Sequence, residues 1–307
     1  MKRCLALLLV VATASACNPA YYVALKFVYR RADLPTAQVV HDISYDPVSG
    51  DPHRALDLFT PEGSGWPVVV FVHGGSWTEG DRALKVGGAD IYANVGRFLA
   101  SHGIGAAVIS YRLIPAVDWR TQAGDVLKAV AWTYDTIAIY GGRRDQIFLM
   151  GHSSGSQVAM RVALESNRLT AAGVPASAIR GVIAVSGAGY DLADQTTYDL
   201  GHSPDFYAKR FRTQAGDINW QHDGSVTPLV TPWAPPTLVI FAGGDPAPLR
   251  RQSQVMFDAL KGAGANATLT EVPGLSHTRI LLSLSQEHRE ASSAALAFIA
   301  ERTRLTP

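Results

Sequence analysis

Short apolar runs recur along the chain at intervals typical of a domain in which strands and helices alternate. A strand covered on both faces needs no polar positions, so continuous apolar runs predict buried strands at 68–72, 105–110, 147–150, 181–185, 237–241 and 267–272. Apolar positions at helical spacing predict helices at 91–101, 123–139, 156–166, 250–261 and 287–302. Alternation of this kind favours a mostly parallel sheet with helices on both faces.

The pattern changes at two places. Residues 39–45 and 55–59 read as an opening antiparallel pair of strands, because the turn-rich segment 46–52 joins them. Residues 187–236, which we call the insertion, lack the alternation of strands and helices. After Tyr190, they contain the polar and aromatic residues Tyr198, His202, Phe206, Tyr207, Phe211 and Trp220. A fully solvated excursion is the alternative, but so many aromatic side chains are unfavourable in water.

The N-terminus resembles an export signal. Positive charge at 1–3, an apolar core at 4–12 and small residues at 13–16 follow the order of a secretory signal peptide, predicted over 1–16. The apolar run is too short to span a bilayer of roughly 30 Å. We therefore expect an exported protein with a tether at 18–38 and one folded domain at 39–307.

Cys17 follows the small residues directly. The segment 14–17 resembles the lipobox of bacterial lipoproteins, with Ala14 where an aliphatic residue is usual. Two outcomes remain open: lipidation of Cys17 as the first mature residue, with anchoring to an envelope membrane, or ordinary cleavage that leaves a free thiol in a periplasmic or secreted protein. Cys4 would leave with the signal, so the mature chain would contain no disulfide.

The amino-acid composition and net charge limit the classes of partner and cofactor that we expect. The chain has 307 residues, 47% of them hydrophobic, and a formal net charge of +1 with no basic run. A single domain of ordinary enzyme size is expected, and nothing favours nucleic acid as a partner. No pair of histidines has the spacing of a helical metal site, so we expect no metal or other cofactor. The sequence does not indicate an oligomeric state.

The strongest candidate for chemistry is Gly151-His152-Ser153-Ser154-Gly155. It lies between a predicted buried strand and a predicted helix, which is the context of a nucleophile elbow. A Gly/Ser loop is the alternative interpretation. In an elbow, Ser153 is the nucleophile, and the N–H of Ser154 at the helix N-terminus is free to stabilise an oxyanion. His152 is expected to shape the substrate pocket rather than to transfer protons.

A serine hydroxyl needs a base that accepts its proton. Asp245 follows the predicted strand 237–241, and His277 follows the predicted strand 267–272. Alone, Asp245 could be a turn aspartate and His277 a surface histidine. Both fall at strand ends and in the chain order Ser, Asp, His, which predicts a triad of Ser153, Asp245 and His277.

Residues 73–77, His-Gly-Gly-Ser-Trp, follow the predicted strand 68–72. They resemble the HGGG motif of carboxylesterases and hormone-sensitive-lipase-like hydrolases, with Ser76 in place of the third glycine. The resemblance implies that the N–H groups of Gly75 and Ser76 join that of Ser154 in an oxyanion hole. Trp77 is expected to line the substrate site.

Together these motifs resemble α/β-hydrolases of the esterase group that also holds arylformamidase-like and prenylcysteine-methylesterase-like enzymes. Further matching segments lie at 80–81, 110–115, 140–142 and 251–253. The resemblance implies a mostly parallel eight-stranded sheet and an insertion that forms a small cap over the active site. Thr278 departs from the family, which often has an aromatic residue at this position.

The function expected from this resemblance is hydrolysis of small carboxylic esters, with short to medium acyl groups, through an acyl-enzyme. Hydrolysis of an amide or formamide by the same triad is an alternative, motivated by Arg251, Gln252 and Ser253. The export signal argues against it. A non-catalytic binding module on the same scaffold is an alternative of another class.

Overall fold

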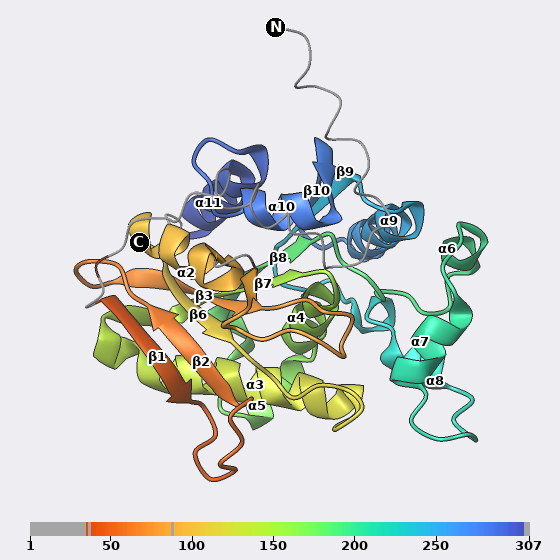
Figure 1. The fold of residues 1–307 in the computed structure, drawn as a ribbon, viewed down its shortest axis with the longest axis horizontal. Helices are drawn as coiled ribbons and strands as arrows, with labels where there is room; N and C mark the ends of the chain where they lie inside the picture. The colour runs from red at the N-terminus through yellow and green to blue at the C-terminus, as the bar shows by residue number, and fades with distance from the viewer. Residues whose placement is uncertain (1–34, 36–37, 87–88, 304–307) are drawn as a thin grey trace, which may run out of the picture.

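An eight-stranded sheet forms the centre of the computed structural model, which describes residues 35, 38–86 and 89–303 (Figure 1). Its strands, in spatial order, are β1 (Val39–Ser44), β2 (Ala55–Phe59), β6 (Gly105–Ile109), β3 (Trp66–Val72), β7 (Gly142–His152), β8 (Ile179–Val185), β9 (Thr237–Gly244) and β10 (Ala267–Ser276). β2 pairs antiparallel with β1 and β6, and all other neighbours pair parallel. The prediction of a mostly parallel eight-stranded sheet is confirmed.

The strand β3 shows why its apolar run is continuous. Val68, Val70 and Val72 belong to the hydrophobic core on one face of the sheet. Val69 and Phe71 alternate with them and belong to a second core on the other face. Because successive side chains of a strand point to opposite faces, a strand between two cores must be apolar at every position.

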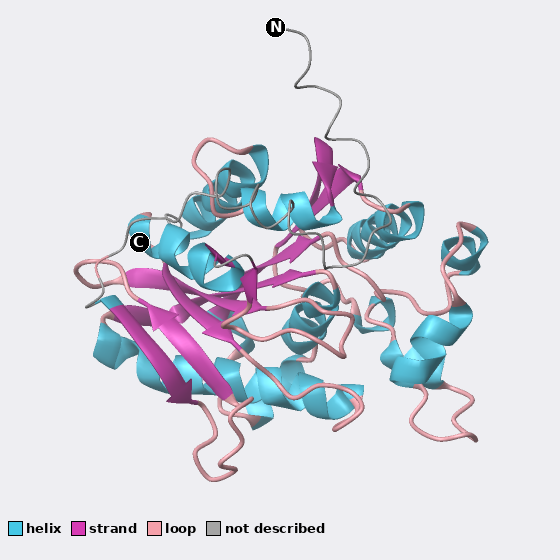
Figure 2. Cartoon of the chain, viewed as in Figure 1, coloured by secondary structure: helices cyan, strands magenta, loops and turns pink. Residues whose placement is uncertain are grey.

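Helices cover both faces (Figure 2). One core is closed by α2 (Ile91–Ser101), α10 (His277–Ser283) and α11 (Glu290–Thr303). The other is closed by α3 (Trp119–Thr136), α4 (Ser154–Leu164), α5 (Ser166–Ala171) and α9 (Ala247–Gly262). Short elements complete the body: η2 (Ile137–Tyr140), η3 (Ala176–Ala178) and the strand pair β4 (Lys85–Val86) and β5 (Ala89–Asp90).

Most element boundaries differ from the predicted ones by a few residues, and two of the larger shifts have a local reason. α3 begins four residues before the predicted helix, because the side chain of Asp118 accepts a hydrogen bond from the N–H of Thr121 and caps the helix. β7 begins five residues before its predicted strand, because charged residues at 143–145 conceal the apolar pattern there. α3 also ends three residues before the predicted helix, where η2 begins, and β7 continues two residues past its predicted strand, to His152.

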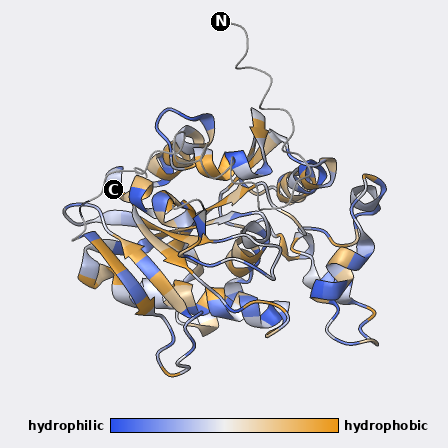
Figure 3. Ribbon diagram, viewed as in Figure 1, coloured by the Kyte–Doolittle hydropathy of each residue, from blue (hydrophilic) through white to orange (hydrophobic). Residues whose placement is uncertain are grey.

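The insertion forms α6 (Gln195–Asp199), α7 (Pro204–Phe211), α8 (Trp220–Gly224) and η4 (Thr227–Leu229), which lie together at one end of the sheet (Figure 1). Its polar segments are visible beside the apolar central strands in Figure 3. Tyr207, Phe211 and Trp220 are nonetheless buried, so the insertion packs on the domain through its aromatic residues. In the described part of the chain, no helix is long and apolar enough to span a membrane.

Candidate active site

The turn at Ser153 places its side chain at the carboxyl edge of the sheet. Ser153 lies between the end of β7 and the start of α4, and its φ of 56° falls in the left-handed region. The flanking glycines have no room for a side chain. A Cβ on Gly155 would lie 2.2 Å from the carbonyl oxygen of His73, and one on Gly151 would lie 2.4 Å from that of Gly155. This crowding explains both glycines of the motif.

The structure brings the three predicted triad residues together. Nε2 of His277 lies 3.0 Å from Oγ of Ser153, and Nδ1 of His277 lies 2.7 Å from Oδ1 of Asp245. Asp245 follows β9, and His277 opens α10 directly after β10. β9 and β10 are parallel neighbours, so their carboxyl ends present the acid and the base at the same edge.

The carboxylate of Asp245 is buried and held by three donors. Besides His277, Oδ2 accepts hydrogen bonds from Oγ of Ser186 at 2.6 Å and from the N–H of Ala242 at 2.9 Å. Burial raises the pKa of Asp245, but the hydrogen bonds from His277 and Ser186 outweigh burial and hold the pKa below its usual value. Asp245 is therefore ionised at neutral pH.

The sequence prediction missed Ser186. It directly follows β8, and its Oγ orients Asp245. Its position at the carboxyl end of a predicted buried strand was the available signal, but serine is common in such turns.

His152 lies behind His277 rather than in an open pocket, which differs from its expected role in substrate binding. Its Nε2 lies 3.0 Å from the carbonyl oxygen of His277, and the two ring centres are 4.7 Å apart. Burial lowers the pKa of His152 to about 3, so the ring is neutral and its Nε2–H donates to that carbonyl. His152 thus supports the backbone from which His277 projects.

The loop at 73–77 approaches the elbow closely. A Cβ on Gly74 would lie 3.1 Å from Cβ of Ser153. Its geometry is unusual, since Gly75, Ser76 and Trp77 all have positive φ, at 125°, 54° and 65°. We call residues 73–77 the oxyanion loop, after the role predicted for it.

Three successive carbonyl groups of this loop are held by donors. The Gly74 oxygen lies 2.7 Å from Nδ1 of His73. The Gly75 oxygen accepts from the N–H groups of Thr78 and Glu79 at 3.1 and 2.9 Å. The Ser76 oxygen accepts from Nε of Arg210 at 2.8 Å. In a trans peptide the N–H points away from the C=O, so the N–H groups of Gly75, Ser76 and Trp77 face away from these donors.

The side chain of Trp77 does not line an open substrate site, contrary to the prediction. It is 1% exposed and lies edge-on to the rings of Phe206, Tyr207 and Phe211 of the insertion. Its Nε1–H donates to Gln157 of α4 at 3.2 Å. Trp77 therefore joins the oxyanion loop to the insertion. The sequence could not reveal this, because a tryptophan beside a catalytic loop suits either role.

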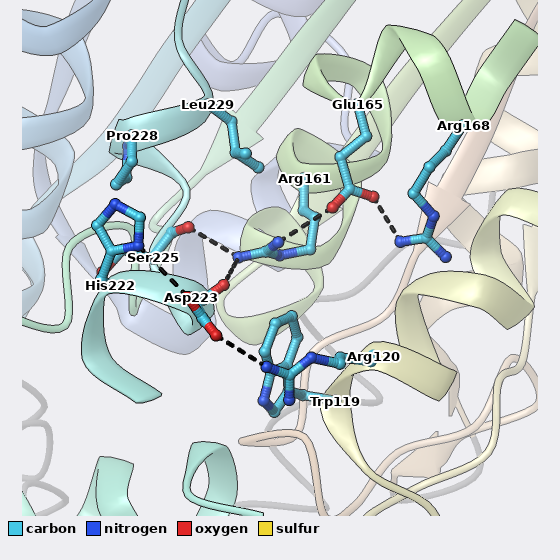
Figure 4. A pocket seen from close by; sticks show the side chains of 10 residues that line it. All are labelled: Trp119, Arg120, Arg161, Glu165, Arg168, His222, Asp223, Ser225, Pro228 and Leu229. Carbon is cyan, nitrogen blue, oxygen red and sulfur yellow. Dashed lines mark hydrogen bonds and ion pairs between the residues drawn. The ribbon is translucent and has the colours of Figure 1, made fainter. Parts of the chain in front are cut away.

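A separate cavity of about 510 Å³ lies where the insertion meets α3 and α4, and no triad residue lines it (Figure 4). Its arginines are all engaged. Arg161 donates to the carbonyl oxygens of Asp223 and Ser225, both at 2.7 Å, and pairs with Glu165 at 3.1 Å. Figure 4 shows the same bonds, together with the pairs Arg168–Glu165 and Arg120–Asp223. The residues that line this cavity therefore include those that bind the insertion to α4.

The described residues contain no group of three or more His, Cys, Asp or Glu side chains that could hold a metal ion. Arg112, in the matching segment 110–115, donates two hydrogen bonds to the carboxylate of Asp125, both at 2.8 Å.

The strand order and the Ser–His–Asp arrangement define an α/β hydrolase in architecture. A family model described as alpha/beta hydrolase fold matches residues 69–281, which is more than half of the chain. The chain therefore belongs to this family.

Curated relatives and solved structures agree with this assignment. The chain is 30% identical over 260 residues to a probable isoprenylcysteine alpha-carbonyl methylesterase of Oryza sativa subsp. japonica, covering 80% of this chain and 59% of the relative. It is 29% identical over 255 residues to esterase LipC of Mycobacterium tuberculosis, covering 80% and 62%. The chain thus spans about three fifths of the length of these relatives. The structure of Esterase B from Lactobacillus rhamnosis is similar in fold, with a TM-score of 0.76, 21% identity and coverage of 93% and 91%.

Proposed function

We propose that this protein is a serine hydrolase that cleaves carboxylic esters through an acyl-enzyme. The observation that carries the proposal is the hydrogen-bonded series of three side chains. Nε2 of His277 lies 3.0 Å from Oγ of Ser153, and Nδ1 of His277 lies 2.7 Å from Oδ1 of Asp245. The names of the curated relatives, which are esterases, support the type of bond.

In the proposed mechanism, Oγ of Ser153 attacks the ester carbonyl while Nε2 of His277 takes its proton. Asp245 keeps the imidazole in the correct tautomer and stabilises the imidazolium. The N–H groups of Gly75, Ser76 and Ser154 receive the negative charge on the former carbonyl oxygen. The tetrahedral intermediate then collapses, His277 protonates the leaving alcohol, and an acyl ester remains on Ser153. Water attacks this ester with His277 again as base, which releases the acid and restores the serine.

The direct test replaces Ser153 with alanine and measures turnover of a short p-nitrophenyl ester. We expect kcat to fall by about a thousandfold or more, because loss of a triad nucleophile costs several orders of magnitude. Unchanged unfolding by urea establishes that the variant is folded. Turnover within about tenfold of the wild type contradicts the role of Ser153.

Acyl groups of short to medium length are the proposed substrates. The aromatic residues of the insertion pack against the oxyanion loop and support a confined site rather than an open groove. A series of p-nitrophenyl esters of increasing chain length checks this. The best substrate is expected among the short and medium chains, and a maximum at long chains with activation at an oil interface would contradict it.

Two of the three residues that motivated an amide-hydrolase alternative, Arg251 and Gln252, have structural contacts. Arg251 pairs with Asp194, and the side-chain amide of Gln252 donates to the carbonyl of Asp191 and to Thr197. Both residues thus fasten α9 to the insertion. A direct comparison of esters with N-formyl anilides distinguishes the two reactions. Labelling by a fluorophosphonate, described below, distinguishes both from a non-catalytic binding module.

We also propose that the protein is exported and anchored through a lipidated Cys17, which lies outside the described residues, as do the predicted signal peptide and nearly all of the tether. The support is the order of charged, apolar and small residues before Cys17. Fractionation of wild type and Cys17→Ala, with mass spectrometry of the mature N-terminus, tests it. An unmodified cysteine at the N-terminus of a soluble protein would reject anchoring and leave the hydrolase proposal intact.

A further inference from the structure

The oxyanion loop is fixed from two sides, and one of them is the insertion. On the side of the domain, the carbonyl oxygen of Trp77 accepts from Nε2 of Gln122 at 2.8 Å and from the N–H of Ile114 at 3.0 Å. On the other side, Ser76 and the Trp77 ring contact α7. Ser76 and Trp77, both with positive φ, therefore lie between the rest of the domain and helix α7 of the insertion.

Arg210, in the last turn of α7, makes the polar contact on the insertion side. Its Nε donates to the carbonyl oxygen of Ser76 at 2.8 Å, and its Nη1 donates to that of Phe206 at 2.8 Å. Its guanidinium carbon lies 3.6 Å from the centre of the Phe206 ring. Stacking on the Phe206 ring and the hydrogen bond to the Phe206 carbonyl hold the planar guanidinium in place. Together they fix the direction in which Nε donates.

The consequence for the loop follows from peptide geometry. The bond to the Ser76 oxygen fixes the plane of the peptide between Ser76 and Trp77. That plane is set by ψ of Ser76 and φ of Trp77, and both residues have positive φ, which is an unfavourable backbone conformation for a non-glycine residue. Without a partner for this carbonyl, the loop can relax toward negative φ. A change of φ at Ser76 turns this peptide against the preceding one, which carries the N–H of Ser76, one of the proposed oxyanion donors.

We propose that Arg210 is a positioning residue for the oxyanion hole, so that the insertion takes part in the chemical step as well as in substrate choice. This inference rests on the proposed esterase function. Arg210 acts through the Ser76 carbonyl and does not itself contact the reacting atoms. Burial lowers the pKa of Arg210 only from a very high starting value, so the guanidinium remains charged and adds a positive field beside the loop.

The test compares Arg210→Met with Lys209→Met. Both changes remove one positive charge from the last turn of α7, but Lys209 is exposed. For Arg210→Met we expect kcat to fall about thirtyfold with KM changed by less than about threefold, since the affected interaction belongs to the transition state. Loss of a direct oxyanion donor costs roughly a hundredfold or more, so an indirect effect is smaller. Lys209→Met should leave both constants unchanged.

A second measurement distinguishes a specific effect on the oxyanion hole from a general loss of order in the active site. A trifluoromethyl ketone adds reversibly to the serine and forms an oxyanion, so its inhibition constant should rise in parallel with the fall in kcat/KM. The carboxylic acid product, which forms no oxyanion, should bind Arg210→Met as it binds the wild type. Arg210→Lys keeps the charge without the planar fork and should recover only part of kcat; it also serves if the methionine variant does not fold.

Three outcomes overturn the inference: kcat within twofold of wild type in Arg210→Met, a rise in KM with kcat unchanged, or an unchanged inhibition constant for the ketone. In each of these cases the wild-type enzyme remains active and depends on Ser153, so the proposed function stands. An inactive wild type, or an active Ser153→Ala variant, would instead reject the proposed function itself.

Discussion

At the scale of single residues, the buried carboxylate of Asp245 depends on its hydrogen-bond donors. The hydroxyl of Ser186 donates to the ionised carboxylate and to no competing acceptor among its described contacts. We expect Ser186→Ala to lower the free energy of unfolding by about 2 kcal/mol at neutral pH, the size of a hydrogen bond to a charged group. Urea unfolding measures this difference.

The pH dependence of the same difference gives a sharper test. The bond favours the carboxylate and holds the folded pKa of Asp245 below its ordinary value of 3.8. The stabilisation is therefore complete well above pH 3.8 and is lost as the pH falls through the lower, folded pKa. We expect wild type and Ser186→Ala to differ by a constant amount from pH 5 to 8 and to converge in more acidic solution. A difference that grows toward low pH would contradict this account.

The sequence allowed prediction of the three side chains that the structure brings together, but not of the residues that hold them in place. Ser153, Asp245 and His277 could be predicted because each falls at the end of an apolar strand, and strand ends are readable from the pattern. Ser186, His152 and Arg210 act through bonds to a carboxylate or to backbone carbonyls across the fold. Such bonds depend on how separate elements approach each other, which no local pattern records. Trp77 was misassigned for the same reason.

At the scale of elements, the contact between α4 and the end of β3 sets the elbow. A Cβ on Gly155 would lie 2.2 and 2.3 Å from the carbonyl oxygens of His73 and Val72, which are backbone atoms with little freedom to move. We expect Gly155→Ala to destabilise the protein by about 3 kcal/mol or more and to abolish most activity, since the turn that carries Ser153 must open.

Gly124 provides a matched control for this change. It lies within α3, and a Cβ there would approach no atom closer than 3.8 Å, the nearest being Nη2 of Arg168. Gly124→Ala should raise the free energy of unfolding by about 0.5–1 kcal/mol, because alanine loses less backbone entropy in a helix. If both variants were equally unstable, the close packing of the elbow would not explain the glycine at position 155.

Element boundaries were predicted well where the apolar pattern dominates and poorly where a polar group decides. The strand β2 matches its predicted range, since all five residues are buried. The start of α3 depends on the capping carboxylate of Asp118, and the start of β7 carries charges that face outward. Local polar contacts of this kind shift an element by a few residues without altering the fold.

At the scale of the whole molecule, the insertion is tied to the domain through Arg161. The buried guanidinium donates to two carbonyl oxygens of the insertion, those of Asp223 and Ser225. Arg161→Met leaves both carbonyls without this donor, and each unsatisfied buried group costs about 1–3 kcal/mol. We expect trypsin to cleave the insertion at least about tenfold faster in this variant, which corresponds to 1.4 kcal/mol.

Arg168→Met is the control for that experiment. Arg168 is half-exposed and pairs only with Glu165 in the cavity of Figure 4, and exposed pairs contribute about 0–1 kcal/mol. Its cleavage rate should remain close to that of the wild type. Equal rates for wild type and Arg161→Met would show that the aromatic contacts alone hold the insertion in place.

A serine that acts as the nucleophile of an acyl-transfer site reacts covalently with a phosphorylating inhibitor, so labelling of Ser153 decides whether the proposed function holds. The measurement is reaction with a fluorophosphonate followed by peptide mapping by mass spectrometry. We predict one adduct per chain, on Ser153, with ester hydrolysis lost in proportion to labelling and with much slower labelling of His277→Ala. Wild-type protein that hydrolyses esters while Ser153 stays unmodified, or a Ser153→Ala variant that is labelled and inactivated like the wild type, would contradict the account.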